Sequence, residues 1–138
     1  MQVRERNKSL SKLIYIIGQF RASTTWGIEC NVRVAETYAL RIWKMGHVAV
    51  CPHLNSRFFH GELPDSTFLE GDLLILSKCD AVLAITGWIR SKGAQNEVKY
   101  AKDQNIPVFY SLQGLKLELN KQRKTSHENP IDPSPHIV

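Results

Sequence analysis

Short apolar runs alternate along this chain with longer segments in which apolar residues recur every three or four positions. Leu13 to Ile17 form one such run, and Ala81 to Ile85 form another. Runs of this length are typical of strands that are buried on both faces of a sheet. Strands that alternate with helices favour parallel β-α-β units, so the alternation restricts the chain to a small group of folds.

Four strands and three helices are predicted from these patterns. The strands cover residues 13–17, 47–51, 81–85 and 106–110, and the helices begin near residues 28, 65 and 94. Asp65 follows Pro64 and can cap the second helix. We expect an α/β fold with a single doubly wound domain, Rossmann- or flavodoxin-like, whose central parallel sheet has four to five strands.

The chain has the usual length of one domain, with 138 residues. We expect a basic N-terminal segment over residues 1–12, the α/β domain over residues 13–111 and a C-terminal extension over residues 112–138. Prolines recur near the end of the chain, so we expect the extension to be flexible from about residue 124.

The formal net charge is +5, which suits a small anionic substrate or a nucleic-acid partner. Much of the positive charge lies toward the two ends of the chain, as in solvated tails, and no series of base-stacking aromatic residues accompanies it. Nucleic acid therefore ranks last among the partners. The longest apolar runs are far shorter than the roughly 20 residues of a membrane span, so we expect a soluble protein with no membrane partner.

The cysteines indicate an intracellular chain. Cys30, Cys51 and Cys79 are widely spaced and odd in number, which fits neither a disulfide framework nor a zinc site. The apolar run after the basic start is too short for a signal peptide. A single histidine beside Cys51 is more often structural than a metal ligand. We expect reduced cysteines, a cytoplasmic location, no metal and no cofactor.

Two carboxylates stand at the edges of predicted apolar helix faces. Glu97 comes three residues after Ala94 and four before Ala101, and Asp72 has the same relation to Leu69 and Leu76. Burial can raise the pKa of such a carboxyl, and a helix N-terminus can lower it, so either group could serve catalysis. The alternative is that both are ordinary boundary residues of their helices.

A phosphate could bind where the third predicted helix begins. Ser91 and Gly93 lead into that helix, so a hydroxyl and backbone N–H groups are available there. Arg21, just after the first strand, could supply a second contact. The chain has neither a Walker loop nor a G-x-G-x-x-G fingerprint after Ile17, which favours a monophosphate over a triphosphate or a dinucleotide.

The ligand crevice of a doubly wound sheet lies at the carboxyl ends of its strands. His53, Asn55 and Trp88 lie on loops at those ends and would edge the pocket. Trp88 could stack on a base, or it could cover the sheet edge or a subunit contact.

Several motifs occur in an order that agrees with the predicted elements. They are Tyr15-x-x-Gly18-x-x-Arg21, Gly71-Asp72-Leu73, Cys79-Asp80-Ala81-Val82-Leu83 and Ser91-x-Gly93-x-x-x-Glu97. With these motifs the chain resembles the nucleoside 2-deoxyribosyltransferase superfamily, most closely the deoxyribosyltransferase-like domains of phage and bacterial genomes. The resemblance covers residues 13 to 110.

The resemblance implies a role for three residues. Glu97 matches the nucleophile that attacks the sugar anomeric carbon, Asp72 matches an aspartate at the reacting end of the substrate, and Tyr15 matches a tyrosine that orients the nucleophile. Base-exchanging transferases have an aspartate at the position of Ser91, whereas the branch that hydrolyses nucleoside 5′-monophosphates is more similar there. Gly18, Arg21, Ser91 and Gly93 would then bind the substrate, with Ser91 and Arg21 on its phosphate, although that branch has a serine where this chain has Gln19.

The implied reaction is cleavage of the N-glycosidic bond of a nucleoside 5′-monophosphate, with 2′-deoxyribose as the expected sugar. Glu97 would act as the nucleophile and Asp72 would supply a proton to the departing base. Two alternatives stay open: a deoxyribosyltransferase that exchanges bases between nucleosides, and a nucleotide-sensing module without catalysis. Members of the superfamily form dimers or higher assemblies, so the resemblance also implies a homo-oligomer.

Overall fold

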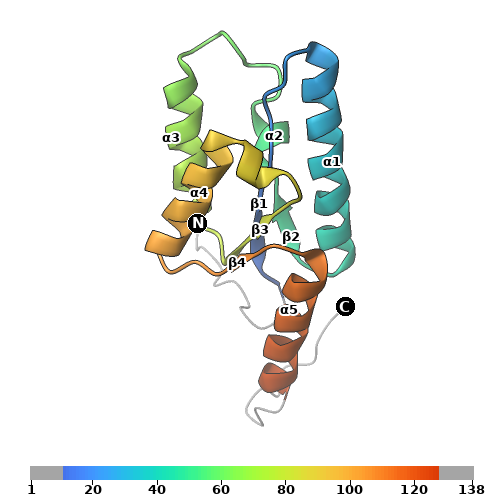
Figure 1. Ribbon diagram of the computed structural model, residues 1–138. Helices are drawn as coiled ribbons and strands as arrows, with labels where there is room; N and C mark the ends of the chain where they lie inside the picture. Colours follow the sequence, from blue (N-terminus) through green and yellow to red (C-terminus); the bar gives the residue numbers. More distant parts are fainter. Residues whose placement is uncertain (1–10, 128–138) are drawn as a thin grey trace, which may run out of the picture.

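A computed structural model describes residues 11–127 of the chain. Its centre is a sheet of four parallel strands, arranged in the order β2-β1-β3-β4. The strands are β1 (Leu13–Ile17), β2 (Val48–Val50), β3 (Ala81–Ala84) and β4 (Val108–Phe109). Helices cover both faces of the sheet, with α3 (Asp65–Leu76) and α4 (Lys92–Asp103) on one side and α1 (Thr25–Lys44) on the other (Figure 1). The predicted α/β class, doubly wound with a parallel central sheet, is confirmed.

The three expected helices occur in the expected order and differ at their ends, whereas residues 52–55 and 88–90, which were expected in loops, are also helical. The helices are α1 (Thr25–Lys44), α2 (Pro52–Asn55), α3 (Asp65–Leu76), α4 (Lys92–Asp103) and α5 (Leu112–His127), and a short 3₁₀ turn, η1, covers Trp88–Arg90. Helix α1 begins before Ile28 because the side chain of Thr24 accepts a hydrogen bond from the Gly27 N–H at 3.0 Å. In the same way Ser91 caps α4, which therefore begins before Ala94.

Asp65 does not cap α3, contrary to the expectation from the sequence. Pro64 occupies the N-cap position, and no side chain caps the helix there. Asp65 is the first residue of α3, and its carboxylate forms an ion pair with Arg21, from the loop after β1. The Asp65 side chain, which was expected to cap the start of α3, instead links α3 to the loop after β1.

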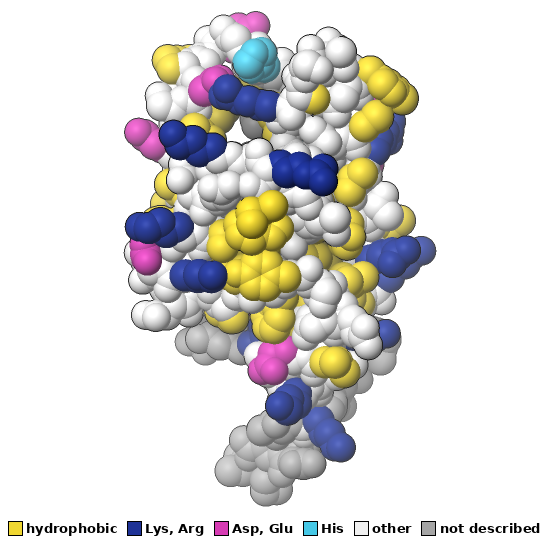
Figure 2. All heavy atoms as spheres, in the orientation of Figure 1, with side chains coloured by type: hydrophobic (Ala, Val, Ile, Leu, Met, Phe, Trp, Pro, Cys, Tyr) yellow, Lys and Arg dark blue, Asp and Glu magenta, His cyan; other side chains and the backbone are white. Residues whose placement is uncertain are grey.

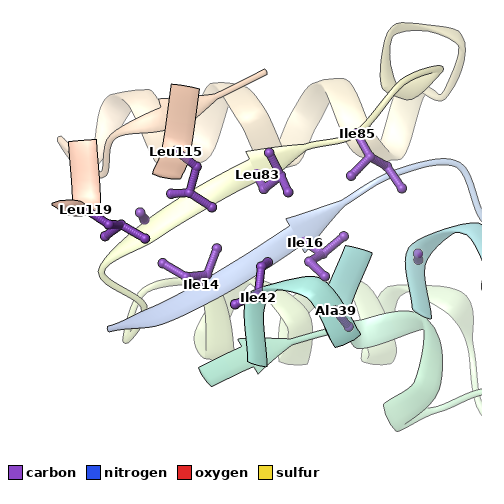
Figure 3. Close-up of a cluster of buried hydrophobic side chains, with 10 residues drawn as sticks. Ile14, Ile16, Ala39, Ile42, Leu83, Ile85, Leu115 and Leu119 are labelled. Atoms are coloured by element: carbon purple, nitrogen blue, oxygen red, sulfur yellow. The ribbon is translucent and has the colours of Figure 1, made fainter. Parts of the chain in front are cut away.

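Two apolar cores lie on opposite faces of the sheet because neighbouring side chains of a strand point to opposite faces. Ile14 and Ile16 of β1 pack against α1 and α5 (Figure 3). Tyr15 and Ile17 point to the other face, where they pack against α3 and α4. The hydroxyl end of Tyr15 therefore lies on the same side of the sheet as both carboxylates.

Helix α5 was missing from the expected elements. Leu115 and Leu119 are buried in the same core as Leu83 of β3 (Figure 3). Residues 112–127 of the C-terminal extension form this helix, including the first residues of the expected flexible segment. The rest of that segment, and residues 1–10 of the N-terminal segment, lie outside the described residues. Within residues 11–127, no helix is both long and apolar enough to cross a membrane.

A substitution in α5 tests whether this helix is part of the fold. Replacing Leu115 with alanine removes a fully buried side chain, so we expect the free energy of unfolding to fall by about 2–4 kcal/mol. Leu117, on the same helix, is 62% exposed, and alanine there should cost less than about 0.5 kcal/mol. Urea denaturation of both variants measures the difference. Equal stability of the two variants would contradict the packing of α5 on the sheet.

Candidate active site

A cavity of about 500 Å³ opens at the carboxyl end of the sheet. This volume is within the usual range for a small-molecule site. The cavity is lined by the loop after β1, by α2 and α3, and by the start of α4. Gly18 allows the loop after β1 to pass close to Ile85, because a Cβ atom at position 18 would lie 2.7 Å from the Ile85 side chain. The crevice has therefore formed where the fold class predicts it.

Glu97 and Tyr15 form a partly buried polar contact at the site. The Tyr15 hydroxyl donates a hydrogen bond to Oε2 of Glu97 at 2.5 Å. Burial raises the pKa of Glu97 to about 7, the nearby Asp72 carboxylate acts in the same direction, and the Tyr15 hydrogen bond opposes both. Burial together with the Glu97 charge raises the pKa of Tyr15 well above its usual range, so the tyrosine remains a donor. Glu97 can thus gain or lose a proton near neutral pH.

Asp72 faces the same cavity from α3. Its carboxyl is half-buried, and burial raises its pKa to about 6. Two carboxyl groups that titrate near neutral pH therefore line one cavity, on two different helices. Clefts with such perturbed groups are the usual setting for acid, base or nucleophilic catalysis.

The start of α4 lines part of the cavity with groups that favour anions. The Ser91 hydroxyl oxygen accepts a hydrogen bond from the Ala94 N–H at 3.2 Å, so its own hydrogen can be donated to a ligand. Backbone N–H groups of a first helical turn have no intrahelical partner and favour anions. Lys92 and Arg90 also line the cavity here. Arg21 lines it from the loop after β1 and pairs with Asp65.

The loop after β1 is held by two polar side chains. Nε2 of His53 lies 2.7 Å from the carbonyl oxygen of Gln19, and Nδ2 of Asn31 donates to the carbonyl oxygen of Phe20 at 3.1 Å. Burial lowers the pKa of His53, so a neutral ring that donates through Nε2 fits this contact. The same ring packs edge-on against Phe20, with centroids 5.3 Å apart.

Most of the residues selected from the sequence come together at this cavity. Gly18, Arg21, His53, Asp72, Ser91, Gly93 and Glu97 line it, and Tyr15 reaches it through Glu97. Asn55 and Trp88 are not part of the lining. Asn55 is exposed on α2, and Trp88 packs against Tyr110 with ring centroids 5.6 Å apart.

Sequence reasoning missed two aromatic residues in the lining, Phe20 and Phe68. Phe68 lies four residues before Asp72 on α3, and this spacing puts both on one helix face. That signal was available once Asp72 had been selected. Phe20 lies in a loop without periodicity, so no pattern indicated its direction.

No group of three or more His, Cys, Asp or Glu side chains that could hold a metal ion occurs among residues 11–127. Cys79 is buried, Cys30 and Cys51 are half-buried, and none of these three residues forms a disulfide bond. None of them lines the cavity.

Replacing Tyr15 with phenylalanine tests the contact to Glu97. The hydrogen bond stabilises the ionised glutamate, so its loss should move the pKa of Glu97 upward. NMR titration of the glutamate carboxyl carbons measures the shift. Tyr38→Phe, on α1 at the other face of the sheet, is the control and should leave that pKa unchanged. An unchanged or lower pKa in Tyr15→Phe would contradict the contact.

Comparisons with known proteins agree with this fold. Residues 12–111 match the model of a family described as a domain of unknown function, DUF7768. No curated protein matches the sequence. Among solved structures, the chain is similar to 2-deoxyribosyltransferase from the psychrotolerant bacterium Bacillus psychrosaccharolyticus, with 16% identity over 70% of this chain and 69% of that chain and a TM-score of 0.54. At this identity the likeness establishes a shared fold.

Proposed function

The chain belongs to the DUF7768 family of domains of unknown function, and from its site we propose that it cleaves the N-glycosidic bond of a nucleoside 5′-monophosphate. The expected sugar is 2′-deoxyribose, and the products are a free base and a sugar phosphate. One observation carries the proposal: Glu97, hydrogen-bonded by Tyr15, faces the same cavity as a second carboxyl, Asp72.

In the proposed first step, ionised Glu97 attacks the anomeric carbon from the face opposite the base. The bond between that carbon and the base nitrogen breaks, and its electron pair leaves with the base. Asp72 donates a proton to the base, directly or through water. The transition state resembles an oxocarbenium ion, which a nearby carboxylate stabilises.

In the second step, water attacks the anomeric carbon of the glycosyl ester on Glu97. The ester bond breaks, Glu97 leaves as a carboxylate, and the water proton passes to the ionised Asp72. Both carboxyl groups then have their starting protonation states. The hydrogen bond from Tyr15 holds Glu97 in position during both steps.

The phosphate specificity rests on the start of α4. The Ser91 hydroxyl, the N–H groups of the first turn and the cations Lys92 and Arg90 give this end of the cavity a positive potential. An aspartate in place of Ser91 would repel a phosphate. Arg21 would complete the site by turning from Asp65 toward the phosphate, which competes with that carboxylate for the guanidinium.

Base exchange is the second candidate, and the fold likeness to a 2-deoxyribosyltransferase favours it. In that reaction a second base replaces water in the second step and takes the sugar from Glu97. The two reactions share the first step, so they differ only in what enters the cavity after the first base departs.

A substrate panel tests the proposal. The purified protein is incubated with each common nucleoside and nucleoside 5′-monophosphate, ribo and deoxy, with and without a second free base, and chromatography detects released or exchanged base. We expect release from deoxynucleoside monophosphates, and release from the nucleosides lower by at least about a hundredfold, the loss of about 3 kcal/mol of phosphate binding. Exchange between unphosphorylated nucleosides would support the transferase instead. Binding without any turnover would support a nucleotide sensor.

A further inference from the structure

An apolar patch is exposed on the face formed by η1, α4 and the segment that follows β4. We call it the aromatic patch, and it consists of Trp88, Ile89 and Tyr110. The rings of Trp88 and Tyr110 are tilted by 34° with centroids 5.6 Å apart. Ile89 is 65% exposed and Tyr110 is 49% exposed, so much of the patch faces solvent. Figure 2 shows hydrophobic side chains gathered at the centre of this face.

Cations surround the aromatic patch. Nζ of Lys102 lies 5.7 Å from the ring centre of Tyr110. Arg90 directly follows Ile89, Lys92 begins α4, and both are exposed and also line the cavity. Figure 2 shows Lys and Arg side chains on several sides of the hydrophobic centre. The patch therefore continues into the positive end of the cavity.

We propose that the aromatic patch and its cations form a docking surface for single-stranded DNA. Proteins that hold single strands combine aromatic rings, on which bases stack, with cations that pair with the phosphates. Here a base would stack on the exposed part of the Trp88 and Tyr110 pair, and the adjacent phosphates would contact Lys102 and Arg90. The net charge of +5 favours the same polyanion.

A second copy of the chain fits this surface less well. In a symmetric dimer the same patch faces itself, so the cations around one patch would meet those around the other. Like charges that face one another oppose association. A polyanion with flat bases matches both the charge and the aromatic rings.

Nucleic acid ranked last among the partners expected from the sequence, because the sequence shows no series of base-stacking aromatic residues. Trp88 and Tyr110 are far apart in the sequence, and the fold brings their rings together beside Lys102. This docking does not depend on base release, so it is measured as binding, separately from catalysis.

The test is fluorescence anisotropy of a labelled oligothymidylate titrated with the full chain at low salt. Lys102→Glu should weaken binding at least about fivefold, and the dependence of binding on salt should become less steep. Lys44→Glu is the matched control, because both lysines stand in the last turn of a helix, and its effect should stay below about twofold. Tyr110→Ala should weaken binding by roughly 5- to 30-fold, whereas Tyr110→Phe, which keeps the ring, should bind as the wild type does.

Three results would overturn the proposal. The first is an absence of binding at low salt, and the second is an equal effect of Lys102→Glu and Lys44→Glu. The third is complete displacement of the oligothymidylate by excess deoxynucleoside 5′-monophosphate, which would locate the DNA in the cavity. If Tyr110→Ala unfolds, Lys102→Glu and Tyr110→Phe still decide the matter, since neither removes the packed ring. Binding in a Glu97→Gln variant without turnover would separate docking from the proposed function.

Discussion

Replacing Glu97 with glutamine should lower base release at least about a thousandfold, a loss of about 4 kcal/mol in transition-state stabilisation. Glutamine has nearly the same shape and can still accept the hydrogen bond from Tyr15, but it cannot form the glycosyl ester. The measurement is kcat/KM for a deoxynucleoside monophosphate. Glu70→Gln, an exposed residue of α3, should keep the wild-type value.

Glu97→Gln should also change the stability of the protein, and this change distinguishes a loss of catalysis from unfolding. Burial raises the pKa of Glu97 to about 7, above its ordinary value of 4.5, so the folded state holds a proton there that the unfolded state has released. The stability from the neutral carboxyl is complete below about pH 4.5 and is lost as the pH rises through 7. Glutamine stays neutral, so Glu97→Gln should be more stable than the wild type at pH 8 by about 1–3 kcal/mol.

Thermal unfolding at pH 4 and pH 8 measures this difference. The two proteins should unfold at similar temperatures at pH 4, and the variant at the higher temperature at pH 8. A variant that is less stable at pH 8 would contradict the burial of Glu97, and its loss of activity would then reflect unfolding.

Replacing Asp72 with asparagine should lower kcat/KM by roughly 10²- to 10³-fold, the usual contribution of a general acid. The loss should be smallest for bases that depart readily without a proton. Asparagine keeps the side-chain size and a hydrogen-bonding group at the cavity wall. Asn96→Ala, at an exposed residue that also lines the cavity, is the control for a simple change of the lining. An equal loss for every base would contradict proton donation by Asp72.

The pH profile gives a second readout of both carboxyl groups. Activity requires ionised Glu97, with a pKa of about 7, and protonated Asp72, with a pKa of about 6. The wild-type profile of kcat/KM should therefore be a bell with its maximum near pH 6.5, midway between the two values. In Asp72→Asn the fall on the alkaline side should disappear. A wild-type profile that is flat between pH 5 and pH 8 would contradict both roles.

The two central strands were predictable because each is a buried run that carries its own signal. The edge strands β2 and β4, expected over residues 47–51 and 106–110, are shorter and only half-buried. The run Leu13–Ile17 became β1 with the bounds expected, and Ala81–Ala84 became β3 one residue shorter. Helix α5 was missed because only Leu112, Leu115 and Leu119 mark its apolar side, among lysines and polar residues typical of a tail. Its burial depends on a sheet face that a local pattern does not reveal.

Part of the candidate site was likewise predictable from the sequence, and part of it was not. Helical spacing put Glu97 and Asp72 at the edges of apolar faces, and both now line one cavity. The ion pair of Arg21 and Asp65 joins the loop after β1 to the first residue of α3, and only the fold determines the relative position of these two segments. Trp88 was expected at the pocket edge, but its ring packs on the ring of Tyr110, which directly follows β4.

Mass spectrometry of the reacting protein tests whether Glu97 forms a covalent bond with the sugar. The wild type is mixed with a deoxynucleoside 5′-monophosphate, quenched in acid during turnover and digested into peptides. We expect a peptide that contains Glu97 with the added mass of the sugar phosphate, and no such addition in Glu97→Gln. Turnover with the sugar attached to a different residue, or undiminished turnover in Glu97→Gln, would contradict this role of Glu97.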